Sequence, residues 1–163
     1  MAEQLWSPWR FEYVSSAGGG DTEDLFLRLP SAGDDRASLI LHRGETVFAV
    51  LNAYPYTSGH TMVVPFRKVA RIQDMTDREL AETNRMVRSV IQWLDAVFAP
   101  QGYNIGVNQG AASGAGVPGH IHWHIVPRWS GDTNFMTTVG EVRVIPMGLG
   151  DAYERIMAAK GDA

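Results

Sequence analysis

Residues 119–129 read GHIHWHIVPRW and place histidines at every second position: His120, His122 and His124. Alternate side chains of a β-strand point to opposite faces, so this spacing predicts a strand whose three imidazoles share one face. The apolar residues between them would form the buried face, packed against a helix: Ile121, Trp123 and Ile125. The histidine face is then expected to be a functional or exposed polar surface.

The segments that flank this stretch predict an α+β domain. Five stretches of β-rich composition predict strands: residues 46–51, 61–66, 103–110, 120–127 and 141–146. Residues 75–100 predict one long helix, because Thr76 and Glu79 match a capping box and apolar residues follow at helical spacing. A short helix near residues 22–29 and a C-terminal helix at 151–160 are expected, and residues 22–44 are otherwise irregular. Short connections favour a mostly antiparallel five-stranded sheet.

Composition sets limits on the class of protein. The 163 residues suit a single domain, residues 1–163, with an aromatic N-terminal arm and linker at 1–21 and a catalytic core at 46–146. A net charge of −4 gives no reason to expect nucleic acid or an anionic membrane as partner. The absence of cysteine excludes thiolate metal sites and fits the cytoplasm, and no signal peptide or membrane-spanning stretch is expected.

Two kinds of chemistry use a row of histidines. Histidine is a common metal ligand, but a strand rises about 3.3 Å per residue, so His120 and His124 are roughly 13 Å apart at Cα. One zinc ion, with Zn–N bonds of about 2.0–2.1 Å, is therefore hard to share among all three, and a metal site would need a further ligand such as His60. We therefore expect no metal site, although a metalloprotein remains an alternative.

The second chemistry is nucleophilic attack by imidazole on phosphorus, which gives a phosphoramidate that water or another acceptor can open. The loop at residues 111–119, AASGAGVPG, favours this interpretation. Glycine allows backbone N–H groups to approach a phosphate closely. A glycine-rich loop directly before a histidine row therefore indicates a phosphate-containing substrate.

These residues together resemble the histidine-triad (HIT) family of nucleotide hydrolases and transferases. The pattern of alternating histidines is met by HIHWHIV at residues 120–126, preceded by NIGVNQG and LNAYPYTSGHTMVVP. LWSPWR near the start and GDTNF after the triad are similar to the bacterial branch related to diadenosine polyphosphate (Ap4A) hydrolases and phosphorylases. The resemblance implies an adenine nucleotide or dinucleoside polyphosphate as partner, and a HIT-like fold completed by a homodimer.

The resemblance also implies roles for individual residues. His122 would be the nucleophile on the α-phosphate, His124 would contact the phosphate or leaving group, and His120 would hold the geometry through a backbone carbonyl. His60 matches the family's upstream histidine. Asn52 matches a ribose-binding position and Asn108 a polar residue near the phosphates. The loop residues expected at the phosphate are Gly116, Val117, Gly119 and, as a hydroxyl donor, Ser113.

Two departures from the family pattern affect the expected activity. Asp24 and Leu27 stand where many relatives carry a zinc-binding Cys-x-x-Cys pair, so no such zinc is expected. Gly116 stands where several members have Ser, Thr or Gln, which leaves the handling of the leaving group open. No cofactor is expected, apart from a divalent cation accompanying the substrate. Hydrolase and phosphorylase both remain open, as do a nucleoside phosphoramidate hydrolase and a non-catalytic nucleotide sensor.

Overall fold

The computed structural model describes residues 24–133 and 145–161, so the predicted N-terminal arm and residues 141–144 of the last predicted strand lie outside it. Its five strands are β1 Ile40–Arg43, β2 Val47–Leu51, β3 Thr61–Pro65, β4 Gly102–Val107 and β5 Trp123–Arg128. Its helices are α2 Leu25–Ser31, α3 Asp77–Phe98 and α5 Leu149–Gly161, with short 3₁₀ turns η1 Ile72–Asp74 and η2 Ala111–Ser113.

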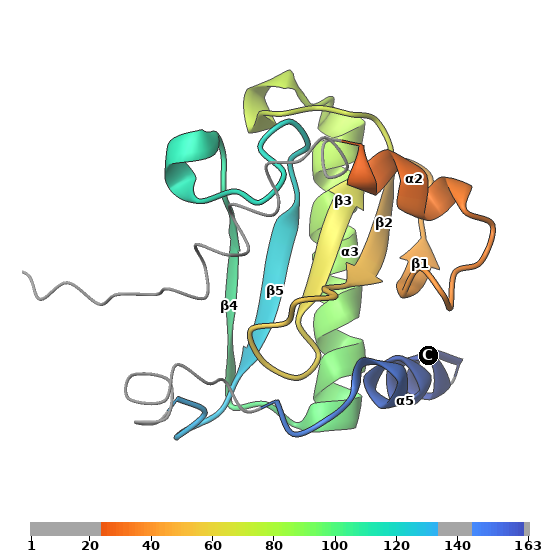
Figure 1. Ribbon diagram of the computed structural model, residues 1–163, viewed down its shortest axis with the longest axis vertical. Helices are drawn as coiled ribbons and strands as arrows, with labels where there is room; N and C mark the ends of the chain where they lie inside the picture. Colours follow the sequence, from red (N-terminus) through yellow and green to blue (C-terminus); the bar gives the residue numbers. More distant parts are fainter. Residues whose placement is uncertain (1–23, 134–144, 162–163) are drawn as a thin grey trace, which may run out of the picture.

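These strands form one antiparallel sheet in the order β1-β2-β3-β5-β4 (Figure 1). The predicted α+β class and five-stranded antiparallel sheet are confirmed, but one strand differs. Residues 22–44 were expected to be irregular beyond a short helix, yet β1 pairs there with β2, Ile40 opposite Val50. Only two of its four residues are buried, and the segment ILHR does not have the composition typical of a strand. Its pairing with β2 compensates for this weak preference.

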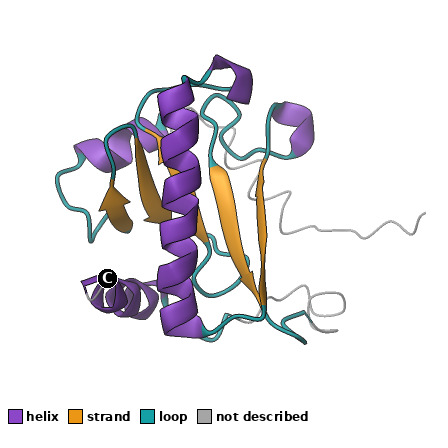
Figure 2. Cartoon of the chain, turned by 180° about the vertical axis from the view of Figure 1, so that it is seen from behind, coloured by secondary structure: helices purple, strands orange, loops and turns teal. Residues whose placement is uncertain are grey.

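Helix α3 forms as the sequence predicts. The side chain of Thr76 accepts a hydrogen bond from the backbone N–H of Glu79, and the carboxylate of Glu79 accepts one from the N–H of Thr76. The helix lies across one face of the sheet (Figure 2). Its apolar side joins α5 and the sheet in the largest buried cluster, which includes Val90, Leu94 and Ile156. This layer covers the face of β3 and β5 that is turned toward α3.

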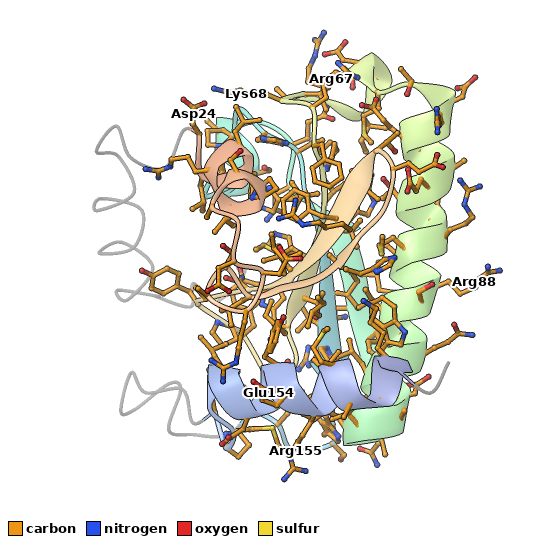
Figure 3. The ribbon with its side chains drawn as sticks, turned by 90° about the vertical axis from the view of Figure 1, so that its right-hand side faces the viewer. Asp24, Arg67, Lys68, Arg88, Glu154 and Arg155 are labelled. Atoms are coloured by element: carbon orange, nitrogen blue, oxygen red, sulfur yellow. The ribbon has the colours of Figure 1, made fainter. Side chains whose placement is uncertain are left out.

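A second apolar cluster packs on the opposite face of the sheet. Phe26 of α2 joins residues of β1, β2 and β3 there, and Val117 of the glycine-rich loop completes the cluster. With the sheet viewed edge on, α2 and α3 lie on opposite sides of it (Figure 3). The central strands β2 and β3 are therefore buried on both faces. Within the described residues, none of the helices is long and apolar enough to cross a membrane.

Candidate active site

The histidine row lies at the start of β5. The strand begins at Trp123, so the expectation of a strand from residue 120 is wrong in its boundary, since His120 and His122 precede the ladder and only His124 is within it. The alternation of faces still holds. Ile121 and Ile125 enter apolar clusters with α3 residues, whereas the three histidine rings lie on the side of α2.

Of the two alternatives for the histidine face, an exposed polar surface does not fit His120 and His122. His120 is 0% exposed and His122 is 4% exposed. The ring of Phe26 packs against both, with its centroid 5.5 Å from that of His120 and 4.9 Å from that of His122. Burial lowers the pKa of both imidazoles, because a low-dielectric surrounding disfavours the charged form. Both rings are therefore neutral at neutral pH.

Hydrogen bonds to backbone carbonyls define the tautomers of these two rings. Nε2 of His120 lies 2.8 Å from the carbonyl oxygen of Pro65, and Nδ1 of His122 lies 2.9 Å from that of His120. A carbonyl only accepts, so each of these ring nitrogens carries the proton and donates. In neutral His122 the proton is thus on Nδ1, and Nε2 retains its lone pair, as a nucleophile requires.

A fourth histidine determines the tautomer of His124. The backbone N–H of Tyr56 donates to Nδ1 of His60 over 3.1 Å, so in neutral His60 the proton is on Nε2. That Nε2 lies 3.0 Å from Nδ1 of His124 and donates to it. Neutral His124 therefore carries its own proton on Nε2, where it can donate to a substrate. The ring centroids of His122 and His124 are 4.9 Å apart, so the imidazole with the available lone pair and the imidazole with the donor are neighbours.

Asn52 lies beside His60. Its backbone N–H donates to the carbonyl of His60 over 2.9 Å, closing the loop between β2 and β3. The side-chain oxygen accepts from the N–H of Tyr54, and the side-chain nitrogen lies 3.3 Å from Nδ1 of His60. The structure therefore brings Asn52 to the histidine cluster, where its amide also orients His60.

Asn108 follows the last residue of β4. The register pairs Gly106 with His124 and Val107 with Trp123, so continuing it by one residue places Asn108 opposite His122. Antiparallel partners share a face of the sheet, and Asn108 is therefore on the histidine side. The pairing itself ends at Val107, so the role of Asn108 near the phosphates stays a prediction.

Only one part of the glycine-rich loop lies against the histidines. Val117 is buried beside Phe26, and its carbonyl accepts from the N–H of His120 over 3.2 Å. Gly116 and Gly119 flank it in the same segment. Ser113, in contrast, is exposed, and its hydroxyl donates to the carbonyl of Gly110 over 2.7 Å. No described contact joins Ser113 to the histidines.

Two aromatic residues contact the site that the sequence alone did not identify. Phe26 packs on His120 and His122, and the ring of Tyr56 lies 4.6 Å from that of His60 and 6.1 Å from that of His124. Tyr56 stands within the loop that carries His60, which was a usable signal. Phe26 lies almost a hundred residues from the triad and resembles any core residue of a short helix.

The remaining histidine, His42, lies outside the site. His42 packs edge-on against Trp93 of α3, away from the site face. Across residues 24–133 and 145–161, no group of three or more His, Cys, Asp or Glu side chains is arranged to hold a metal ion. The histidines there instead combine one imidazole whose Nε2 keeps its lone pair with a neighbouring imidazole that accepts a hydrogen bond from His60.

An antiparallel sheet with alternating histidines at the start of one strand, and a fourth histidine directly before the neighbouring strand, defines an α+β protein with a histidine-triad site. Residues 35–131 match the HIT domain family, and the chain belongs to this family.

Relatives and solved structures agree with this assignment. The chain is 38% identical over 165 residues to the AP-4-A phosphorylase of Mycobacterium tuberculosis, covering 97% of this chain and 84% of that protein. It is 38% identical over 95 residues to a bis(5'-nucleosyl)-tetraphosphatase (asymmetrical) of Schizosaccharomyces pombe, covering 58% of this chain and 52% of that protein. A zinc-bound histidine triad family protein from Mycobacterium smegmatis shares the fold, with a TM-score of 0.69 at 24% identity, covering 85% of this chain and 93% of that one.

Proposed function

We propose that this chain is an enzyme that cleaves diadenosine polyphosphates, with diadenosine tetraphosphate as its substrate and inorganic phosphate as the acceptor. Likeness to an AP-4-A phosphorylase over 97% of the chain supports the substrate class, and that match extends further than the 58% matched by the tetraphosphatase. The single observation that carries the chemistry is the hydrogen bond from Nδ1 of His122 to the carbonyl of His120, since it leaves Nε2 with a lone pair.

In the first step, Nε2 of His122 attacks the α-phosphorus. A P–N bond forms, the bond from phosphorus to the bridging oxygen breaks, and ATP leaves. The triphosphate is an anion at neutral pH, since its last pKa is about 6, so it departs without taking a proton. The Nε2–H of His124 donates a hydrogen bond to the oxygen that gains charge. The ring of His122 becomes positively charged, and the carbonyl of His120, which accepts from Nδ1, stabilises that charge.

In the second step, an oxygen of inorganic phosphate attacks the same phosphorus from the opposite side. The P–N bond breaks, its electron pair returns to Nε2 of His122, and ADP is released. The balance is diadenosine tetraphosphate plus phosphate giving ATP plus ADP. Water in place of phosphate would give AMP.

The remaining site residues bind the substrate in this proposal. Asn52 binds the ribose hydroxyls. Asn108 and the backbone N–H groups of Gly116, Val117 and Gly119 bind the α-phosphate, because N–H groups of a glycine-rich loop bind anions. Ser113 has no part here, since its hydroxyl is engaged with its own loop. We also propose that the chain works as a homodimer without a resident cofactor, and that a divalent cation enters with the polyphosphate.

Product analysis tests this function. Purified protein is incubated with diadenosine tetraphosphate, with and without inorganic phosphate, and the nucleotides are separated by chromatography. ATP and ADP that appear only with phosphate support the proposal. ATP and AMP in both reactions would replace phosphate by water as the acceptor. Tight binding of AMP without turnover of the tetraphosphate or of an adenosine phosphoramidate would overturn the enzyme assignment in favour of a nucleotide sensor.

A further inference from the structure

We infer that helix α2 is a working part of the site and that Phe26 is a positioning residue, whose ring holds His122 and His120 in place and keeps water from them. The effect on catalysis rests on the proposed function, because it assumes that His122 is the nucleophile. Phe26 would touch neither the phosphorus nor the leaving group, and would act only through the two imidazoles.

The contact of Phe26 with both histidines carries this inference. The Phe26 ring is 2% exposed and meets His120 edge-on, at 81° between ring planes, and His122 at 50°. Each of these rings donates one hydrogen bond, to a backbone carbonyl, and His122 also packs against the ring of His124. Such a bond leaves a ring free to tilt about it, so a packed aromatic neighbour is needed to define the direction of the Nε2 lone pair.

Helix α2 depends on the rest of the fold for its position. It has only seven residues and contains Pro30, so it is too short to be stable alone. Lys68, which follows β3, donates to Asp24 over 2.8 Å before the first turn, and Arg43 of β1 donates to the carbonyl of Pro30 over 2.8 Å. Figure 3 shows Asp24 and Lys68 side by side at the start of α2. Contacts before its first turn and near its end thus hold Phe26 over the histidines.

The charged groups near the two rings do not account for their protonation state. Asp24 and Lys68 act on His120 in opposite directions, and they are paired with each other. Arg28 of α2 is exposed, and His122 faces the imidazoles of His120 and His124. Burial is the main cause that lowers the pKa of His122, and the hydrogen bond to the carbonyl of His120 opposes it. The apolar cover, to which Phe26 contributes the ring contact, is therefore the feature that favours the neutral nucleophile.

Removing the ring has a consequence that a merely structural residue would not produce. With water admitted, the pKa of His122 rises toward its ordinary value, and protonation then removes the Nε2 lone pair at a higher pH. The acid limb of the kcat profile moves to higher pH accordingly. A looser ring also lowers kcat at every pH, on the order of tenfold to a hundredfold, while KM changes little.

The test compares Phe26→Ala, Phe26→Leu and Leu29→Ala in the full chain. Leu29 packs at the margin of the same apolar cluster, so its truncation loosens α2 without removing the ring. We expect kcat and the acid limb to change most in Phe26→Ala, less in Phe26→Leu and least in Leu29→Ala. The titration of His122, followed by NMR without substrate, is expected to move in the same order. If Phe26→Ala does not fold, the comparison of Phe26→Leu with Leu29→Ala tests the inference.

Two results would overturn the inference. One is an NMR titration of His122 that is the same in folded Phe26 variants as in the wild type. The other is a rise in KM with unchanged kcat, which would make Phe26 a wall of the nucleotide pocket. If the wild type turns over no diadenosine tetraphosphate, the proposed function fails. The NMR titration of His122 then still tests whether the ring of Phe26 keeps water from the imidazoles.

Discussion

His60 and His124 are separated by 64 residues in sequence, and Nε2 of the first lies 3.0 Å from Nδ1 of the second. Because the backbone N–H of Tyr56 donates to the other nitrogen of His60, this hydrogen bond has a defined direction. In neutral His124 it places the ring proton on Nε2, the nitrogen that does not face His60. The loop between β2 and β3 therefore controls what a residue on β5 can do.

The first prediction concerns the loss of the hydrogen bond from His60 to His124. His60→Leu is expected to lower kcat about 10²-fold, near the lower end of the loss when one donor to a developing oxyanion is deleted, because the His124 proton can then sit on either nitrogen. His60→Gln, whose amide can still donate, is expected to recover part of kcat. His42→Leu serves as control, since His42 packs on Trp93 away from the site. An equal loss in the Leu and Gln variants would contradict this role of the hydrogen bond.

The second prediction concerns the nucleophile. His122→Ala is expected to abolish turnover of diadenosine tetraphosphate, since no other described ring nitrogen has both its lone pair and its position beside His124. The variant is expected to fold and to bind AMP, which circular dichroism and calorimetry would measure. Residual activity within about tenfold of the wild type would exclude the covalent route through His122, because removal of a nucleophile ordinarily costs far more.

The third prediction concerns Gly59, directly before His60. Its φ is +78°, and a Cβ there would lie 2.9 Å from Cε2 of Phe98 and 3.0 Å from Cδ2 of Leu94. Gly59→Ala is expected to cost about 1–2 kcal/mol of unfolding free energy for the backbone and about 1–3 kcal/mol more for the crowding, and to lower kcat by displacing His60.

Gly33 provides the matched control for Gly59. Its φ is +77°, but a Cβ there meets nothing within 4 Å. Gly33→Ala is therefore expected to show only the backbone cost of about 1–2 kcal/mol, with kcat unchanged. Urea unfolding and steady-state kinetics measure both effects. Equal losses of stability in the two variants would show that α3 can accommodate the added methyl group.

The fourth prediction follows from the buried imidazoles. The unfolded chain binds protons on His120 and His122 near the ordinary pKa of 6.5, and the folded chain binds them only at lower pH, because burial lowers both pKa values. Between these pKa values the unfolded state holds more protons, so stability falls as the pH falls below 6.5. His122→Leu is expected to reduce this slope.

Carboxylates contribute to acid stability only at lower pH. The pKa of Glu79, lowered to about 2 mainly by its hydrogen bonds with Arg67, affects stability only below its ordinary value of 4.5. Chemical unfolding between about pH 8 and pH 5 therefore measures the contribution of the histidines to stability apart from that of the carboxylates. A free energy of unfolding that is constant over that range would contradict the fourth prediction.

Local patterns in the chain were enough to predict most of its elements and the histidines that the fold brings together. The capping box at Thr76 and Glu79, the helix that follows it and the alternation of the triad depend on neighbours within a few residues, so propensity and periodicity predict them. Strand β1 escaped prediction because it is held by pairing with β2, and a four-residue segment with two polar residues carries no periodic signal.

The protonation state of the site, in contrast, was decided by contacts between distant segments. The carbonyl of Pro65 orients His120, the nitrogen of His60 orients His124, and the ring of Phe26 buries His122. A neutral imidazole has two tautomers of similar energy, so the partner that the fold supplies selects between them, and a pKa depends on burial that no single segment provides. The alternating histidines thus identified the chemistry, and packing determined which nitrogen can perform it.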